Sequence, residues 1–218
     1  MRIFCDFDGT ISLADTADLI LSAFADPVWE DIEAEWVAGE IDSATCMARQ
    51  IPLIDAPLAA IDELLDTVEL RDGFLAFLGW AKRRSLPVQI VSDGVDHFIR
   101  RILARHDIHD VPIIANRLIQ KDGRFSLEQP WRIVGCGSGV CKCHIVETPV
   151  DGRKLVFVGD GRSDFCVASK PDLLFATAGL ERYCRDRQIV HTPFTGFGVV
   201  QSTLESIFVQ SDAFAAVA

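Results

Sequence analysis

Short apolar runs recur along this chain and alternate with segments of helical periodicity. Each run is four or five residues long, rich in Val, Ile, Leu or Phe, and bounded by Gly, Pro or Asp. Strands of this length that alternate with helices form a mostly parallel sheet with both faces covered. We therefore predict an α/β fold with strands at Arg2–Cys5, Pro87–Val91, Val111–Ala115, Leu155–Val158 and Leu173–Ala176.

The segment between Thr10 and about Leu70 breaks this alternation. Its apolar residues follow helical spacing, and it contains no convincing strand pattern. Because no flexible linker flanks it, we predict a helical cap of residues 14–71 that folds onto a core of residues 1–13 and 72–218. A β-hairpin is predicted over Arg117–Gln129, since the Asp-Gly pair within residues 121–123 suits a tight turn.

The chain is acidic: its 218 residues include 21 basic and 32 acidic side chains, a formal net charge of -11. A surface of this sign repels phosphate backbones and anionic lipids, so nucleic-acid and membrane partners are not expected. The seven cysteines, several inside apparent strands or helices, indicate a reducing compartment. No leader pattern and no apolar run of ~20 residues is present, so we expect a cytoplasmic protein. The oligomeric state is left open.

Two carboxylates stand at the end of the first predicted strand, in Asp6-Phe7-Asp8-Gly9-Thr10. In an open α/β sheet, ligands bind at the edge formed by the carboxyl ends of the strands. Two acids two residues apart on a rigid element suit a divalent cation together with a phosphate group. An acidic turn is the alternative interpretation, because Asp and Gly are common turn residues.

Three further polar groups follow the same pattern. Ser92-Asp93-Gly94 follows one predicted strand, Gly159-Asp160 and Asp164 follow another, and Lys142 begins a short predicted helix. Taken singly, these residues have simpler interpretations as a helix N-cap, as turn residues and as a solvated charge. Chance is a poor explanation of their order, which is acid pair, hydroxyl, lysine and acid pair.

With these four motifs the chain resembles the phosphatases of the haloacid dehalogenase superfamily over nearly its whole length. The helical insertion after the first motif, and Asn116-Arg117-Leu118 before the hairpin, resemble the subclass that contains the phosphoserine phosphatases. The resemblance implies a Rossmann-like core with an inserted helical cap, and hydrolysis of a small phosphate ester through an aspartyl-phosphate. Dehalogenases of the superfamily lack the second acid of the first motif, so Asp8 favours phosphoryl transfer.

The resemblance also implies a role for each motif residue. Asp6 is expected to attack phosphorus, and Asp8 to protonate the leaving oxygen and then activate water. The Asp6 carboxylate, the Asp8 backbone carbonyl and Asp160 are expected to hold Mg²⁺, with Asp164 orienting a metal-bound water or Lys142. Side chains and backbone N–H groups expected to bind the phosphoryl oxygens come from Ser92, Asp93, Gly94, Lys142, Gly9 and Thr10.

Three cap residues bear on the choice of substrate. Phosphoserine phosphatases carry a glutamate nine residues after the nucleophile, which grips the substrate amine, and Asp15 is the matching residue here. They also carry a cap arginine that binds the substrate carboxylate, and Gln50 stands at that position with Arg49 beside it. Because Gln lacks the charged fork that a carboxylate prefers, phosphoserine is not the expected substrate unless Arg49 takes over after a one-residue shift.

The cysteine-containing segment around the motif lysine, residues 136–143, indicates other substrates. It is similar to the methionine-salvage phosphatases, which act on a phosphorylated methylthio-enediol, and to the phosphoethanolamine/phosphocholine phosphatases. We expect a salvage-type ester first, with phosphoserine and phosphocholine or phosphoethanolamine as alternatives. A non-catalytic sensor of a phosphorylated metabolite, and a phosphotransferase with an alcohol acceptor, are alternatives of other kinds.

Cys136, Cys141, Cys143 and His144 also have the ligand types of a zinc site. Their C-x₄-C-x-C-H spacing differs from the usual paired C-x₂-C, and the charge of Lys142 among them would repel a cation. We therefore interpret the segment as a loop of small residues that packs beside the active site.

Overall fold

A computed structural model describes residues 1–147 and 152–215 of the chain. Its sheet has seven strands in the order β4-β3-β2-β1-β5-β6-β7. All neighbouring strands are parallel except β3 and β4. The strands are β1 (Arg2–Cys5), β2 (Val88–Val95), β3 (Ile113–Lys121), β4 (Arg124–Glu128), β5 (Leu155–Gly159), β6 (Leu173–Ala176) and β7 (Thr192–Pro193).

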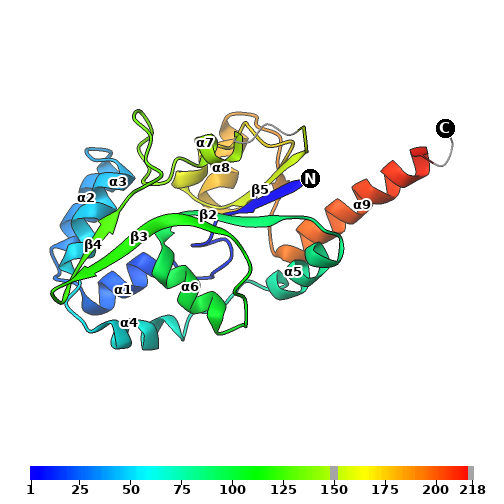
Figure 1. Ribbon diagram of the computed structural model, residues 1–218. Helices are drawn as coiled ribbons and strands as arrows, with labels where there is room; N and C mark the ends of the chain where they lie inside the picture. The colour runs from blue at the N-terminus through cyan, green and yellow to red at the C-terminus, as the bar shows by residue number, and fades with distance from the viewer. Residues whose placement is uncertain (148–151, 216–218) are drawn as a thin grey trace.

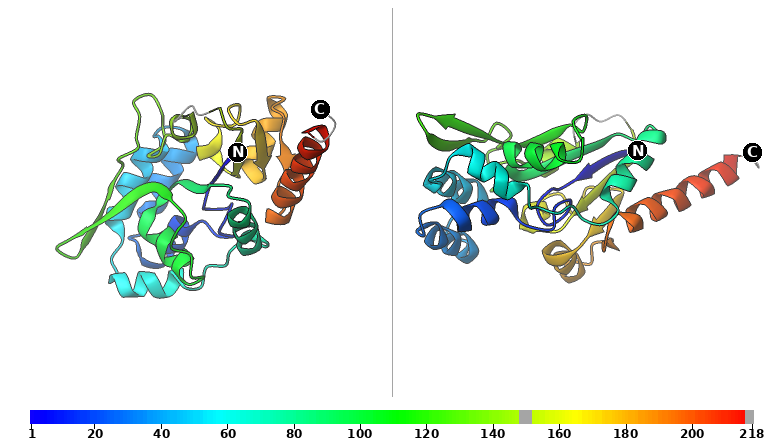
Figure 2. Two further views of the ribbon diagram at one scale, coloured as in Figure 1. Left: turned by 45° about the vertical axis from the view of Figure 1, so that its right-hand side comes forward. Right: turned by 90° about the horizontal axis from the view of Figure 1, so that it is seen from below.

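The helices are α1 (Thr16–Phe24), α2 (Trp29–Ala38), α3 (Ser43–Gln50), η1 (Ile51–Leu53), α4 (Leu58–Leu65), α5 (Phe74–Arg83), α6 (Asp96–Ala104), α7 (Lys142–Glu147), η2 (Arg162–Asp164), α8 (Ala178–Asp186) and α9 (Phe197–Ala215). Helices α1–α4 gather at one end of the molecule, near the β3–β4 hairpin, and α9 extends at the opposite end (Figure 1). The other two views keep this arrangement (Figure 2). Among the described helices, none combines the length and apolarity needed to cross a bilayer.

Both faces of the sheet are buried. Successive side chains of its central strands point to opposite sides and enter two different apolar clusters. Ile3 of β1 and Val156 of β5 belong to one apolar cluster, which includes residues of α1, α5, α6 and α9. Phe4 and Phe157, their neighbours along the strands, belong to a second cluster with residues of α7 and α8. This arrangement confirms the predicted α/β fold with helices on both faces of a mostly parallel sheet.

The strand predictions are confirmed, although β2, β3 and β5 differ in extent from the predicted strands. β1 and β6 have the predicted bounds, whereas β2 continues past its predicted end to Val95, with an irregular register after Val91. β3 joins the predicted strand and the first arm of the hairpin into one element, which pairs with β2 and then with β4. Asp122 and Gly123 form the hairpin turn with φ values of 51° and 76°, as an Asp-Gly turn requires.

The helical segment is an insertion whose two ends lie side by side. The backbone N–H of Leu13 donates to the Glu69 carbonyl (3.0 Å), and that of Arg71 donates to the Ile11 carbonyl (2.7 Å). Between these ends the chain forms α1–α4 and η1. The inserted helical cap is therefore confirmed, while its division from the core as a separate domain of residues 14–71 stays a prediction.

Phe197, at the start of α9, is fully buried and joins this helix to α5. Its ring centroid lies 4.9 Å from that of Phe74, and 5.2 Å from those of Phe77 and Phe194. We expect Phe197→Ala to lower the free energy of unfolding by about 3–5 kcal/mol, because the truncation leaves a cavity among these rings. Urea denaturation measures the change.

Leu75→Ala is the control. Leu75 lies on α5, the helix against which Phe197 packs, and 49% of its surface is exposed. Its effect on the free energy of unfolding is expected to stay within about 0.5 kcal/mol. An unchanged unfolding midpoint in Phe197→Ala would contradict the packing of α9 on α5.

Candidate active site

The carboxyl ends of three strands meet at the centre of the sheet. β1 lies between β2 and β5, so the chain passes to one side of β1 first and to the other side later. A crevice opens at such a reversal of strand order. Asp6 and Asp8 follow β1, Ser92 lies in β2, and Asp160 follows β5; all four line one pocket of about 580 Å³.

Lys142 is the first residue of α7 and is completely buried behind the pocket residues Asp6 and Ser163, which it contacts. Its Nζ lies 2.6 Å from Asp6 Oδ2, 2.6 Å from Asp164 Oδ1 and 2.9 Å from Ser163 Oγ. Burial acts to lower the pKa of Lys142, but the charges of Asp164 and Asp6 outweigh it and raise the pKa above its usual value. Lys142 is therefore a fixed cation beneath the strand ends.

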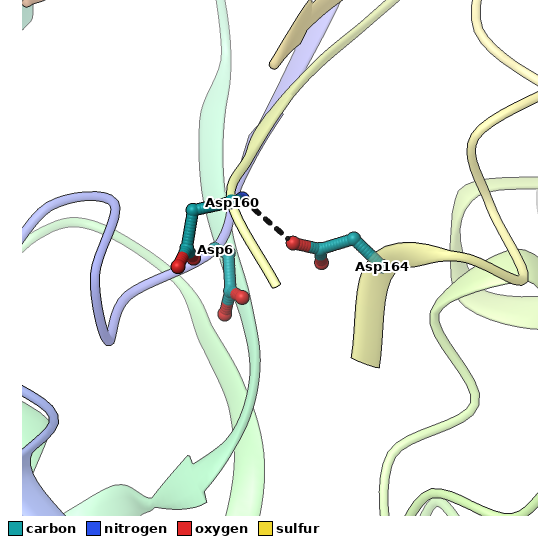
Figure 3. A group of neighbouring side chains, drawn as sticks. All are labelled: Asp6, Asp160 and Asp164. Atoms are coloured by element: carbon teal, nitrogen blue, oxygen red, sulfur yellow. Dashed lines mark hydrogen bonds between the residues drawn. The ribbon is translucent and has the colours of Figure 1, made fainter. Parts of the chain in front are cut away.

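Asp164 organises the loop that follows β5. Its Oδ2 accepts the backbone N–H groups of Asp160 (2.9 Å) and Gly161 (3.1 Å), while its Oδ1 binds Lys142. Figure 3 shows the first of these bonds, with the Asp6 carboxylate beside that of Asp160. The Thr10 hydroxyl donates to Asp160 Oδ1 (3.0 Å) and so links this loop to the one after β1.

Asp6, Asp160 and Asp164 form a cluster of three carboxylates, of which Asp6 and Asp164 contact the Lys142 ammonium. One oxygen of each lies within 4.8 Å of the others. Burial, and then the charge of Asp164, raise the pKa of Asp160 to about 6, and the same two causes raise the pKa of Asp6. Excess negative charge on hard oxygen ligands fits a divalent cation such as Mg²⁺. Asp6 and Asp160 line the pocket and Asp164 does not, so these two carboxylates are the ones placed to hold it.

The Asp8 carboxylate has other partners. Its Oδ1 accepts the backbone N–H (2.8 Å) and the hydroxyl (2.6 Å) of Thr16, and Ser92 Oγ donates to its Oδ2 over 3.5 Å. Burial and the charge of Asp15 raise the pKa of Asp8 to about 7, against the bonds from Thr16. A carboxyl group with this pKa gains and loses a proton near neutral pH, as a general acid and base must.

At two motif glycines, a side chain would collide with a carboxylate of the site. Gly9 has a φ of +69°, and a Cβ on it would lie 2.3 Å from Asp160 Oδ2. A Cβ on Gly94 would lie 2.3 Å from Asp8 Oδ2. The backbone therefore approaches both carboxylates closely. The Gly94 N–H, an expected donor to phosphoryl oxygens, donates to the Ser92 hydroxyl in this structure (2.9 Å).

The Asp93 carboxylate connects the cap to the core. It accepts hydrogen bonds from Ser43 Oγ of α3 (2.6 Å), from the Val140 N–H (2.9 Å) and from Asn116 Nδ2 (3.4 Å). The Asp93 carboxylate is an acceptor in all three bonds, so it offers no donor to a phosphate group. The part of Asp93 that is suited to phosphate binding is thus its backbone.

Two of the three cap residues, Asp15 and Gln50, line the pocket, and Arg49 does not. Gln50 is buried and donates its Nε2 to Glu33 Oε2 (2.9 Å). Arg49 forms a two-pronged ion pair with Glu35 on the outside of the cap. The one-residue shift that would bring Arg49 to the substrate is therefore absent from this structure.

Sequence reasoning missed several residues that the structure places at the site, among them Thr16, Ser43 and Ser163. Thr16 follows directly on Asp15 at the start of α1, so a helix N-terminus at Asp15 was the available signal. Ser43 and Ser163 carry no local signal, because their partners Asp93 and Lys142 are 50 and 21 positions away along the chain.

Comparison with known proteins agrees with this geometry. The family model described as haloacid dehalogenase-like hydrolase matches residues 3–169. The 2-hydroxy-3-keto-5-methylthiopentenyl-1-phosphate phosphatase of Geobacillus thermodenitrificans (strain NG80-2) is 32% identical, over 94% of this chain and 96% of that protein. The protein of the same name from Geobacillus kaustophilus (strain HTA426) is 31% identical, over 93% and 94%. A solved substrate-bound phosphoserine phosphatase complex is similar in fold, with a TM-score of 0.69 and 21% identity over 93% of this chain and 97% of that chain.

We expect Ser43→Ala to loosen the junction of cap and core, because it removes a hydrogen bond to a buried carboxylate. Such bonds to charged groups contribute about 1.5–3 kcal/mol. Amide hydrogen exchange in residues 43–50 and 137–141 is expected to rise about tenfold or more. The control is Ser202→Ala, which removes an exposed hydroxyl bonded within α9 (3.2 Å) and leaves these segments unchanged. Unaltered exchange in residues 43–50 of Ser43→Ala would contradict the prediction.

Proposed function

The chain belongs to the haloacid dehalogenase-like hydrolase family, and we propose that it is a Mg²⁺-dependent phosphomonoesterase acting on 2-hydroxy-3-keto-5-methylthiopentenyl-1-phosphate or a closely similar small ester. Family membership confirms the resemblance drawn from the four motifs. The observation that carries the proposal is the buried Lys142 ammonium, which is held between Asp6 and Asp164 at the ligand-binding edge of the sheet. We infer the substrate from the names of relatives that match nearly the whole chain.

In the first step, a carboxylate oxygen of Asp6 attacks phosphorus. The bond from phosphorus to the ester oxygen breaks, and that oxygen takes the proton of Asp8. The Asp6 carboxylate is held for this attack, because the Phe7 N–H donates to its Oδ1 (2.7 Å) and Lys142 contacts its Oδ2. A fixed orientation of the nucleophile lowers the entropic part of the barrier.

In the second step, ionised Asp8 takes a proton from water, and the water oxygen attacks phosphorus. The bond between phosphorus and Asp6 breaks, and inorganic phosphate and a protonated Asp8 result. The Lys142 ammonium and the Ser92 hydroxyl are the side-chain donors that would stabilise the phosphoryl oxygens in both steps. Asp6, Asp160 and the Asp8 backbone carbonyl would hold Mg²⁺, which when bound supplies the further positive charge that a phosphate dianion needs.

The pocket lining offers apolar surface to the tail of an ester. Trp36, Met47 and Phe165 line it, and aromatic and thioether groups make favourable contacts with each other. Arg162 is the basic lining residue among those described; it stacks on the Trp36 ring (5.2 Å) and donates to the Trp36 carbonyl (3.1 Å). The carboxylate of phosphoserine would instead meet acidic side chains of the cap: Asp15, Asp18, Glu33 and Asp42.

The compartment we propose is the cytoplasm. All seven cysteines are free in the structure, including Cys141 and Cys143, whose sulfur atoms lie 3.4 Å apart. Free thiols in this number persist in reducing compartments.

Phosphate release from a panel of esters tests the proposal. With Mg²⁺, we expect the largest kcat/KM for the methylthiopentenyl phosphate, and at least about a tenfold smaller value for phosphoserine, whose charged carboxylate lacks a partner. Phosphocholine and phosphoethanolamine complete the panel. Omission of Mg²⁺ and the variant Asp6→Asn are each expected to abolish turnover of every ester.

The matched control is Asp122→Asn, the same change in the exposed hairpin turn, where positive φ suits Asn equally well. It should keep full activity. Faster turnover of phosphoserine or phosphocholine would overturn the proposed substrate. Binding of an ester without phosphate release would overturn the enzymatic function and favour a sensor.

A second prediction concerns the proton on Asp8. Thr16→Val removes the hydroxyl that stabilises the ionised Asp8 carboxylate, so the pKa of Asp8 is expected to rise. The protonated acid then persists to higher pH, and the alkaline limb of the kcat/KM profile moves upward by about one pH unit. Thr16→Ser keeps the hydroxyl and should retain the wild-type profile. Superimposed profiles for Thr16→Val and the wild type would exclude Asp8 as the titrating acid.

A further inference from the structure

Arg71 lies where the chain leaves the cap, beside the loop that follows β1. Its backbone N–H donates to the Ile11 carbonyl (2.7 Å). Its guanidinium donates through Nε to the Thr10 carbonyl (2.8 Å) and through Nη2 to the Gly9 carbonyl. One residue thus supplies hydrogen-bond donors to three consecutive carbonyl groups of this loop.

The N–H groups of the loop have a different partner. Those of Thr10, Ile11 and Ser12 donate to the Phe7 carbonyl over 3.2, 2.8 and 2.9 Å. The loop is therefore held through its N–H groups by Phe7 and through its carbonyl groups by Arg71. A planar guanidinium, with its donors in a fixed fork, can bind two neighbouring carbonyls at once, whereas an ammonium lacks this fork.

The position of this loop determines the geometry of the carboxylates that would hold Mg²⁺. The Thr10 hydroxyl donates to Asp160 Oδ1 (3.0 Å), and a Cβ on Gly9 would lie 2.3 Å from Asp160 Oδ2. An oxygen of Asp160 lies within 4.8 Å of one of Asp6. The Asp8 carbonyl, the third expected ligand, belongs to the peptide that precedes Gly9. Because Mg²⁺ demands a near-ideal octahedron, a shift of the loop would weaken its binding.

Arg71 is itself fixed from another side and lies outside the active-site pocket. Its guanidinium stacks on the buried Phe194 ring (5.2 Å), an arrangement that favours a cation. It lines a separate cavity of about 690 Å³, the hinge cavity, formed by residues 66–76 with Arg105 and His106. Any effect of Arg71 on the chemistry must therefore pass through the loop.

We propose that Arg71 is a positioning residue: its guanidinium fixes the Gly9 and Thr10 backbone and thereby the geometry of the Mg²⁺ ligands. This inference rests on the proposed function, which assigns Mg²⁺ to these ligands. The sign of the effect identifies the mechanism. Loss of a positive charge near a cation site strengthens cation binding by Coulomb's law, whereas loss of ligand geometry weakens it.

Calorimetric titration of the full chain with Mg²⁺, without any ester, tests the proposal. We expect Arg71→Ala to raise the dissociation constant about tenfold or more, because two charge-assisted hydrogen bonds to the loop are lost. Guanidinium at millimolar concentration should restore binding in this variant and leave the wild type unchanged. It can reach the vacated position from the hinge cavity, which Arg71 lines. A general loss of stability would not respond in this way.

Arg71→Lys keeps the charge without the fork and is also expected to weaken Mg²⁺ binding, so it decides the matter if Arg71→Ala does not fold. Arg105→Ala is the matched control. Arg105 lines the same cavity, its nearest acid is Asp66 at 3.9 Å, and its removal should not weaken binding.

Unchanged or tighter Mg²⁺ binding in both Arg71 variants would overturn the positioning role and leave the proposed phosphatase function intact. Weaker binding in Arg71→Ala without rescue by guanidinium would overturn it too. A wild-type protein that neither binds Mg²⁺ nor releases phosphate would instead overturn the proposed function, and the inference with it.

Phosphate release by the same variants separates metal geometry from substrate binding. At limiting Mg²⁺ we expect Arg71→Ala to lose activity about in proportion to its weaker metal binding, and at saturating Mg²⁺ to regain most of it. A defect that persists in full at saturating Mg²⁺ would contradict an action through the metal ligands.

Discussion

A single buried ammonium joins the parts of this active site. Lys142 contacts Asp6, which follows the central strand, and Asp164, which lies on the loop after the neighbouring strand. Each partner would be an uncompensated buried charge without the others, a state that is strongly destabilising by about 3–5 kcal/mol. Three segments from distant parts of the chain are therefore held in one arrangement. The same ammonium is the positive charge that the proposed mechanism assigns to the phosphoryl group.

The sheet supplies the fixed frame that such an ion pair needs. β1 has only four residues, yet it is anchored on both faces, by Ile3 in one apolar cluster and Phe4 in the other. Asp6 follows at once, and its backbone N–H donates to the Val158 carbonyl of β5 (2.9 Å). Because strand packing fixes the backbone up to this point, the Asp6 carboxylate has little freedom to leave Lys142.

Features with local signals were predictable from the sequence, and features that depend on distant partners were not. β1 and the hairpin were predicted because an apolar run ends at Asp6 and because Asp122-Gly123 specifies a turn. β2 was predicted too short, since Ser92-Asp93-Gly94 is polar. Strand geometry continues there because Asp93 is buried with hydrogen-bond donors from the cap and the neighbouring strand.

Asp15 couples the cap electrostatically to the Asp8 carboxylate, in addition to lining the pocket. Its carboxylate is the N-cap of α1 and accepts the N–H groups of Ala17 (3.0 Å) and Asp18 (3.1 Å), a role in which a short acid is preferred. Its charge also raises the pKa of Asp8, while Thr16, the next residue, opposes that effect through its bonds to Asp8. The first turn of α1 thus sets the proton affinity of the proposed general acid from both directions. In the proposed mechanism, a substitution at Asp15 or Thr16 would therefore change the proton affinity of Asp8 together with the wall of the pocket.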